Sequence, residues 1–117
     1  MGVILEKELS DGKKFRLYGV NAPEVKELYF EEAKAFTENL VLGKEISFEQ
    51  EENYKVDKFG RELGYVFIDG VNLNVELVRN GLAKVVLYEK RAKIKYQDEL
   101  LSAEKSAQEL SLGIWKK

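Results

Sequence analysis

The sequence predicts an α+β fold, a small five-stranded β-barrel with three packed helices. Apolar and polar residues alternate over several short segments separated by Gly-containing turns, a pattern typical of hairpin-connected strands. Elsewhere apolar residues recur at helical spacing. The 117 residues contain no linker, repeat or low-complexity tract and suffice for one core, so we expect a single domain over residues 1–117.

The chain is expected to open with a β-hairpin. Its strands cover residues 3–9 and 13–20, and Asp11, followed by glycine, suits the positive φ of the tight turn between them. Pro23, the only proline, ends the second strand because it lacks an N–H and disfavours helical conformation in the residue before it. A rigid corner therefore follows this strand.

A helix is predicted over residues 29–42, where apolar residues recur every three to four positions and Gly43 provides the stop. Residues 44–50 alternate again and form the third expected strand. We expect Ile46 and Phe48 to face inward and to contribute to the core.

The second half again alternates strands with helices. A strand over residues 63–68 is followed by an Asp-Gly pair, which predicts a second tight hairpin. A short helix over residues 74–80 is expected to end at Gly81 in the left-handed conformation, before a fifth strand over residues 82–87.

The chain ends with a basic connector over residues 88–93, a helix over residues 94–110 and Trp115, which we expect to anchor the end by packing. Five short strands in this order, with helices between and after them, are typical of the oligonucleotide/oligosaccharide-binding (OB) barrel.

The composition excludes several kinds of chemistry. There is no histidine and no cysteine, which excludes disulfides, zinc fingers, thiolate nucleophiles and imidazole bases. The net charge of −2 counts against a protein that coats nucleic acid through bulk charge, but not against a local basic cleft. Without a long apolar run or a basic-then-apolar leader, we expect a soluble protein, cytoplasmic or secreted in mature form, with no membrane partner.

The second strand and its corner concentrate groups suited to chemistry. Arg16 lies within the strand, and Asn21 and Glu24 follow at its end. An arginine, an amide and a carboxylate together are groups that hold a phosphate and a hard cation. The structural alternatives are a strand arginine paired with a surface carboxylate, and turn roles for Asn21 and Glu24.

The chain resembles the staphylococcal nuclease (thermonuclease) family over nearly its whole length. The resemblance lies in residues 16–24 (RLYGVNAPE), 32–37 (EAKAFT), 57–61 (DKFGR) and 71–85 (VNLNVELVRNGLAKV), with a closing Gly-Ile-Trp. It implies a five-stranded OB-fold barrel with three helices, and Ca²⁺-dependent hydrolysis of phosphodiester bonds in DNA and RNA.

The resemblance also implies roles for individual residues. Arg16 and Arg61 match the family's phosphate-clamping arginines, and Glu24 matches the glutamate that orients or deprotonates the attacking water. Three further residues fall near positions that contact the nucleotide: Lys58, Phe59 and Tyr88. Exposed single aromatics are also routine on small barrels. We expect Asp57 to brace the loop that carries Arg61 and not to bind metal.

The calcium ligands depart from the family pattern. Asn21 stands where the family usually has an aspartate ligand, and its amide adds no negative charge. A second aspartate expected before the first strand has no counterpart, and the opening strand looks truncated. A calcium site at Asn21 is therefore expected to be weak or lost. The alternative function is an inactive module of this fold that binds nucleic acid or protein. We expect a monomer, or a dimer if another chain completes the barrel edge.

Overall fold

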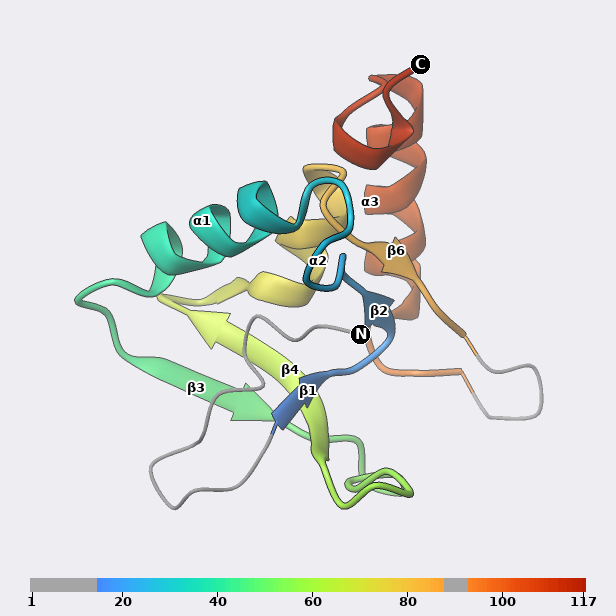
Figure 1. Cartoon of the computed structure of the whole chain (residues 1–117). Coiled ribbons are helices and arrows are strands. Elements are labelled where there is room, and N and C mark those ends of the chain that lie inside the picture. Colours follow the sequence, from blue (N-terminus) through green and yellow to red (C-terminus); the bar gives the residue numbers. More distant parts are fainter. Residues whose placement is uncertain (1–14, 88–92) are drawn as a thin grey trace.

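The computed structural model describes residues 15–87 and 93–117 (Figure 1). Within these ranges the protein has the expected α+β fold, and the predicted first strand, over residues 3–9, lies outside them. The helices are α1 (Phe30–Val41), α2 (Leu73–Arg79) and α3 (Gln97–Glu109), followed by the 3-10 turn η2 (Gly113–Trp115). The strands are β1 (Phe15–Leu17), β2 (Val20–Asn21), β3 (Ile46–Glu49), β4 (Glu62–Ile68), β5 (Val71–Asn72) and β6 (Lys84–Val85).

Strand β4 is the centre of the main sheet. Its first half pairs in parallel with β1, its second half pairs antiparallel with β3, and its end pairs antiparallel with β5. Strands β2 and β6 form a separate antiparallel pair. Over the described ranges the strands form an open, OB-like arrangement and not a closed ring (Figure 1).

The predicted strand over residues 13–20 is interrupted within its described part. Gly19, with φ of +80°, separates β1 from β2 and redirects the chain from β4 towards β6. The positive φ favours glycine, and a side chain at this position would also require the ends of the Ile94 and Leu100 side chains to shift. The expectation of one continuous strand was wrong because period-two alternation cannot reveal such a bend.

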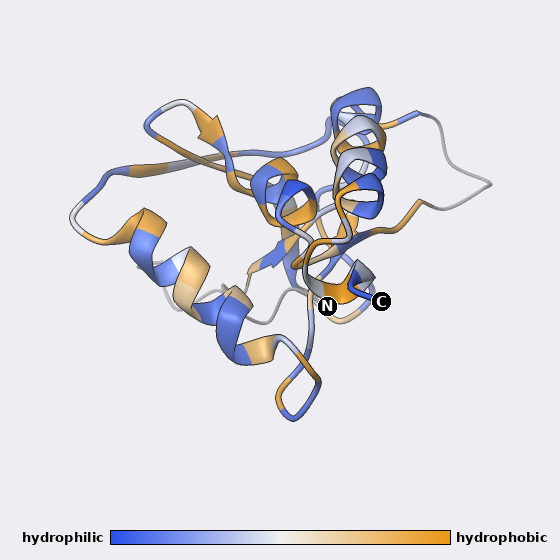
Figure 2. Cartoon of the chain, turned by 90° about the horizontal axis from the view of Figure 1, so that it is seen from above, coloured by the Kyte–Doolittle hydropathy of each residue, from blue (hydrophilic) through white to orange (hydrophobic). Residues whose placement is uncertain are grey.

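The helices agree closely with their predicted ranges. Helix α2 contacts α1, α3 and β4 and lies between the other two helices (Figure 1). Helix α3 buries Leu100, Ala103 and Ala107, which recur at helical spacing and so lie on one stripe. Figure 2 shows polar and apolar residues mixed along α1 and α3, as amphipathic helices require. None of the helices in the described ranges combines the length and apolarity needed to cross a bilayer.

The turns that depend on local sequence match their predictions. The residues between β4 and β5, Asp69 and Gly70, both have positive φ, as the predicted tight hairpin requires. Gly81 ends α2 with φ of +73°. Both predictions are confirmed. They could be made from the sequence because the turn residues themselves determine the backbone conformation.

The expectation that Ile46 and Phe48 of β3 contribute to the buried core is wrong. Ile46 is 49% exposed and Phe48 is 42% exposed, although the Phe48 ring keeps an edge contact with Phe15, with centroids 5.0 Å apart. Strand β3 lies at the edge of the described sheet. Alternation identifies residues that share a face, but it does not reveal how far a neighbouring layer covers that face.

Candidate functional site

Strand β1 presents Arg16 between two core residues. Phe15 and Leu17 are buried, whereas Arg16 is half-buried, because successive side chains of a strand point to opposite faces. Strand β2 ends at Asn21, which is exposed and lies opposite Lys84 of β6. Strand β1 thus carries Arg16 and strand β2 carries Asn21, two of the predicted polar residues.

The pairing of β1 with β4 brings Arg16 near Arg61. Arg16 is the register partner of Leu63, and Arg61 lies two residues before Leu63, directly ahead of β4. In regular strand geometry, residues offset by two positions across neighbouring strands have Cα atoms about 8 Å apart, and Arg61 borders this ladder. Two long side chains at this separation can grip one phosphate.

The side chain of Arg61 is held by Asp57. Its Nε–H donates to Asp57 Oδ2 at 2.7 Å, and its backbone N–H donates to Asp57 Oδ1 at 3.0 Å. The Phe59 N–H also donates to Asp57 Oδ1, at 2.9 Å. The prediction that Asp57 braces the Arg61 loop is confirmed.

The environment of Asp57 favours its charged form. Partial burial alone would raise the pKa of this carboxyl, but hydrogen bonds from the backbone and side chain of Arg61 and from the Phe59 N–H outweigh it and hold the pKa below its ordinary value. The ion pair therefore persists at neutral pH.

Phe59 lies beside two cations. Its ring is 70% exposed, and its centroid lies 5.3 Å from Lys58 Nζ and 5.2 Å from Arg61 Cζ. An exposed ring flanked by cations can stack on a base while the cations contact phosphate. Lys58 and Phe59 thus lie together with Arg61, whereas the third predicted contact residue, Tyr88, is outside the described ranges.

Glu24 lies on the loop after β2 and not on the β1–β4 ladder. Its backbone opens a turn, because the Glu27 N–H donates to the Glu24 carbonyl at 2.8 Å. The Glu24 N–H donates to Glu27 Oε1 at 2.6 Å, so Glu27 supplies the side-chain cap of this turn. Lys26 and Tyr29 both have left-handed φ, which costs on the order of 1–3 kcal/mol each and indicates a tightly shaped loop.

An open hollow of about 290 Å³ lies beside Asn21. Its polar side chains are Asn21, Glu27 and Lys84. The Nζ of Lys84 lies 5.6 Å from the Trp115 ring centroid, and Lys84 forms no ion pair with the other described residues. Its apolar lining comes from Ala22, Pro23, Leu28 and Ile114.

The described residues do not by themselves fit a calcium ion. Calcium takes six to eight oxygen ligands, several of them from carboxylates. The hollow at the strand end offers the Asn21 amide and the Glu27 carboxylate. Over residues 15–87 and 93–117, no cluster of three or more acidic side chains could hold a metal ion.

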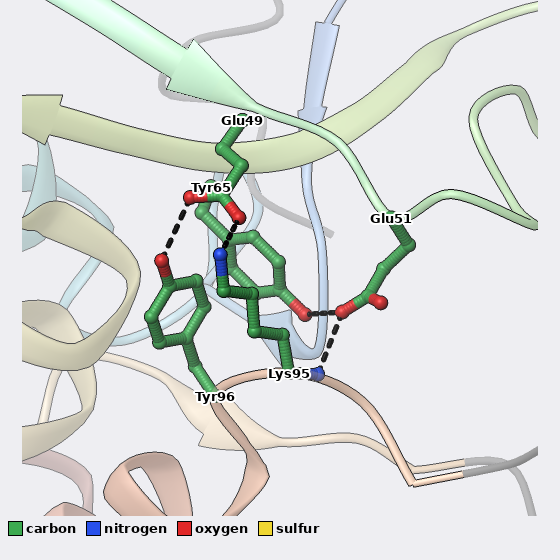
Figure 3. A network of polar contacts seen from close by, with 5 residues as sticks. All are labelled: Glu49, Glu51, Tyr65, Lys95 and Tyr96. Atoms are coloured by element: carbon green, nitrogen blue, oxygen red, sulfur yellow. Dashed lines mark hydrogen bonds and ion pairs between the residues drawn. The ribbon is translucent and has the colours of Figure 1, made fainter.

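A second polar cluster attaches α3 to the sheet (Figure 3). The Tyr65 hydroxyl and the Lys95 backbone N–H donate to Glu51 Oε2, at 2.5 and 2.8 Å. The Tyr96 hydroxyl donates to Glu49 Oε1 at 2.7 Å, and Lys95 Nζ pairs with Glu49 Oε2. Burial and the Glu51 hydrogen bond raise the pKa of Tyr65, so its hydroxyl stays protonated as a donor.

Asn74, which the sequence did not single out, connects three parts of the site's framework. It is fully buried, accepts a hydrogen bond from the Val66 N–H at 3.1 Å, and donates from Nδ2 to the carbonyls of Tyr18 and Gly64, at 2.9 and 3.2 Å. Asn74 therefore ties α2 to β4 and to the chain just after β1. An amide among apolar helix positions was the only sequence signal for this role.

Comparison with known proteins agrees with this architecture. The profile of the family described as "Staphylococcal nuclease homologue" matches residues 14–117. The thermonuclease of Staphylococcus hyicus is 35% identical over 121 residues, which cover 97% of this chain and 68% of that protein. The chain therefore belongs to the staphylococcal nuclease family.

Proposed function

We propose that this protein is a thermonuclease-like phosphodiesterase that hydrolyses DNA or RNA. Membership of the family supports a nuclease-like function. The observation that carries the finer proposal is the parallel pairing of β1 with β4, which has Arg16 opposite Leu63 and Arg61 two residues before it. These two arginines match the phosphate clamp that the family resemblance implies.

In this proposal the two guanidinium groups bind the non-bridging oxygens of the scissile phosphate. Charge on these oxygens grows as water attacks phosphorus, and paired N–H donors stabilise it most in the transition state. Glu24, on the neighbouring β2 loop, orients the attacking water. Lys58 and the Phe59 ring contact the adjoining nucleotide, the cation through phosphate and the ring by stacking on a base.

The expected strength of calcium binding follows from the groups available as ligands. The resemblance implies Ca²⁺, but Asn21 contributes a neutral ligand, so we propose that calcium binding is weak or lost. No step above depends on a metal.

Cleavage of single-stranded DNA tests the proposal. Arg16→Ala and Arg61→Ala are each expected to lower the cleavage rate by about 10²-fold or more. Arg79→Ala is the matched control, because Arg79 is an exposed arginine on α2 that pairs with Glu76, and it is expected to cleave normally. Undiminished cleavage by either clamp variant contradicts its proposed role.

One observation favours a second candidate, a binding module without hydrolysis. The described part of the chain keeps both arginines but contains no cluster of acids able to hold a metal. Single-stranded DNA that binds in a fluorescence anisotropy titration but is never cut, with or without calcium, would select this candidate.

We also propose that residues 1–117 form one domain and that the protein is monomeric. Light scattering on a sizing column tests the oligomeric state, and a mass of two chains would contradict it. A single, probe-independent unfolding transition is expected for one domain.

A further inference from the structure

We propose that Asp57 is a positioning residue that aims the Arg61 guanidinium at the scissile phosphate. This inference rests on the proposed phosphodiesterase function and assigns Asp57 a part in it. Asp57 does not touch the substrate in this scheme; it acts through Arg61.

The two carboxylate oxygens of Asp57 have different partners. Oδ1 accepts from the backbone N–H groups of Phe59 and Arg61 and so shapes the loop. Oδ2 accepts from Arg61 Nε–H at 2.7 Å and so fixes the side chain. The side chains of Asp57 and Arg61 are only 11% and 20% exposed, so water competes weakly for this pair.

Two contacts together fix the orientation of the guanidinium. Asp57 holds its Nε edge, and the Phe59 ring lies beside it, 5.2 Å from Cζ. The Nε bond leaves the two terminal Nη groups outside the pair. These groups form the flat fork that binds two phosphate oxygens at once, so the fork is oriented before substrate arrives.

Positioning and simple electrostatics predict opposite results when the charge of Asp57 is removed. A carboxylate near a phosphate site repels the substrate, so neutralising a bystander should tighten binding. Neutralising a positioning residue should instead misalign Arg61 and slow the reaction, because misplacement by about 1 Å costs on the order of 10²-fold in rate.

The experiment uses Asp57→Asn in the full chain. Asparagine keeps an oxygen at Oδ1 for the two backbone N–H groups. Its NH₂ group takes the place of Oδ2 and cannot accept a hydrogen bond from Arg61 Nε–H. We expect kcat on single-stranded DNA to fall by about 10- to 100-fold without a rise in KM. In the Arg61→Ala background the same change is expected to have no further effect.

Asp69→Asn is the matched control. It removes one negative charge at an exposed turn, where Asp69 pairs loosely with Lys44 at 3.7 Å, and asparagine tolerates the left-handed φ of this position. Cleavage is expected to be unchanged. If Asp57→Asn does not fold, as judged by its thermal melt, Asp57→Ser replaces it, because the serine hydroxyl can still cap the loop N–H groups.

Each outcome decides the proposal. Wild-type kcat or tighter binding in the Asp57 variant overturns it while leaving the phosphodiesterase intact. If the wild type does not cleave, the measured quantity becomes the affinity for a fluorescent single-stranded oligonucleotide in EDTA. Asp57→Asn is then expected to bind at least threefold more weakly than the wild type. Equal or tighter binding would refute the positioning role. A wild type that neither cleaves nor binds refutes both this inference and the proposed function.

Discussion

Replacing Asn74 by alanine is expected to lower the free energy of unfolding by about 3 kcal/mol. Three buried hydrogen bonds are lost, to the Val66 N–H and to the carbonyls of Tyr18 and Gly64. The Gly64 carbonyl keeps a second hydrogen bond, from the Tyr18 N–H at 2.8 Å, so it loses little. The other two lost bonds cost roughly 1–2 kcal/mol each, and a small cavity adds to them.

Urea denaturation followed by circular dichroism measures this loss. The transition midpoint should fall while the slope stays constant, because the surface exposed on unfolding hardly changes. Asn80→Ala is the matched control: Asn80 is exposed, and its amide donates only to the Glu76 carbonyl, at 2.8 Å, so the expected change is below about 1 kcal/mol.

Asn74→Asp separates hydrogen bonding from packing. Aspartate has nearly the same shape but turns a donor that faces two carbonyls into an acceptor, so it should destabilise at least as much as alanine. If the free energy of unfolding of Asn74→Asp lies within about 1 kcal/mol of the wild-type value, the hydrogen-bonding explanation is refuted. The loss in Asn74→Ala would then come from the missing side-chain volume alone.

Three further predictions concern the sheet and the strand end. Hydrogen bonds from Lys95 and Tyr96 lower the pKa of Glu49, so its charged form stabilises the fold above the ordinary pKa of a glutamate, and this stabilisation is lost as the pH falls. The wild type should therefore lose more stability than Glu49→Gln between about pH 5 and pH 3. Equal losses for the two proteins in acid titrations would contradict this. Gly64→Ala should destabilise by about 2 kcal/mol in urea, because its Cβ would lie 2.5 Å from the Glu49 carbonyl oxygen; an unchanged midpoint would show that β3 moves away freely. Asn21→Asp should raise calcium affinity about tenfold by calorimetry, and no change would remove our explanation of a weakened site.

Local sequence determined the features that were predicted well. The range of α1 follows from apolar spacing and Gly43, and the β4–β5 hairpin follows from an Asp-Gly pair that accepts positive φ. The role of Asp57 was predictable for the same reason, since all its partners lie within four residues.

Features that depend on distant segments were not predictable. Asn74 bonds to Tyr18, 56 positions away, and Glu49 bonds to Tyr96, 47 positions away. The exposure of β3 likewise depends on which layer covers it and not on its own alternation. Within the candidate site, the motif order predicted candidate residues, but it did not predict the β1–β4 register that has Arg16 opposite Leu63.

The position of Trp115 gives the protein an intrinsic optical reporter. It is the only tryptophan in the chain, and its indole ring lies beside Lys84, which faces Asn21 across the β2–β6 pair. Indole emission responds to nearby charge, so a molecule that enters the hollow beside Asn21 and shifts this ammonium group alters the emission directly. Occupancy of the strand end can thus be followed without a label, in the wild-type chain.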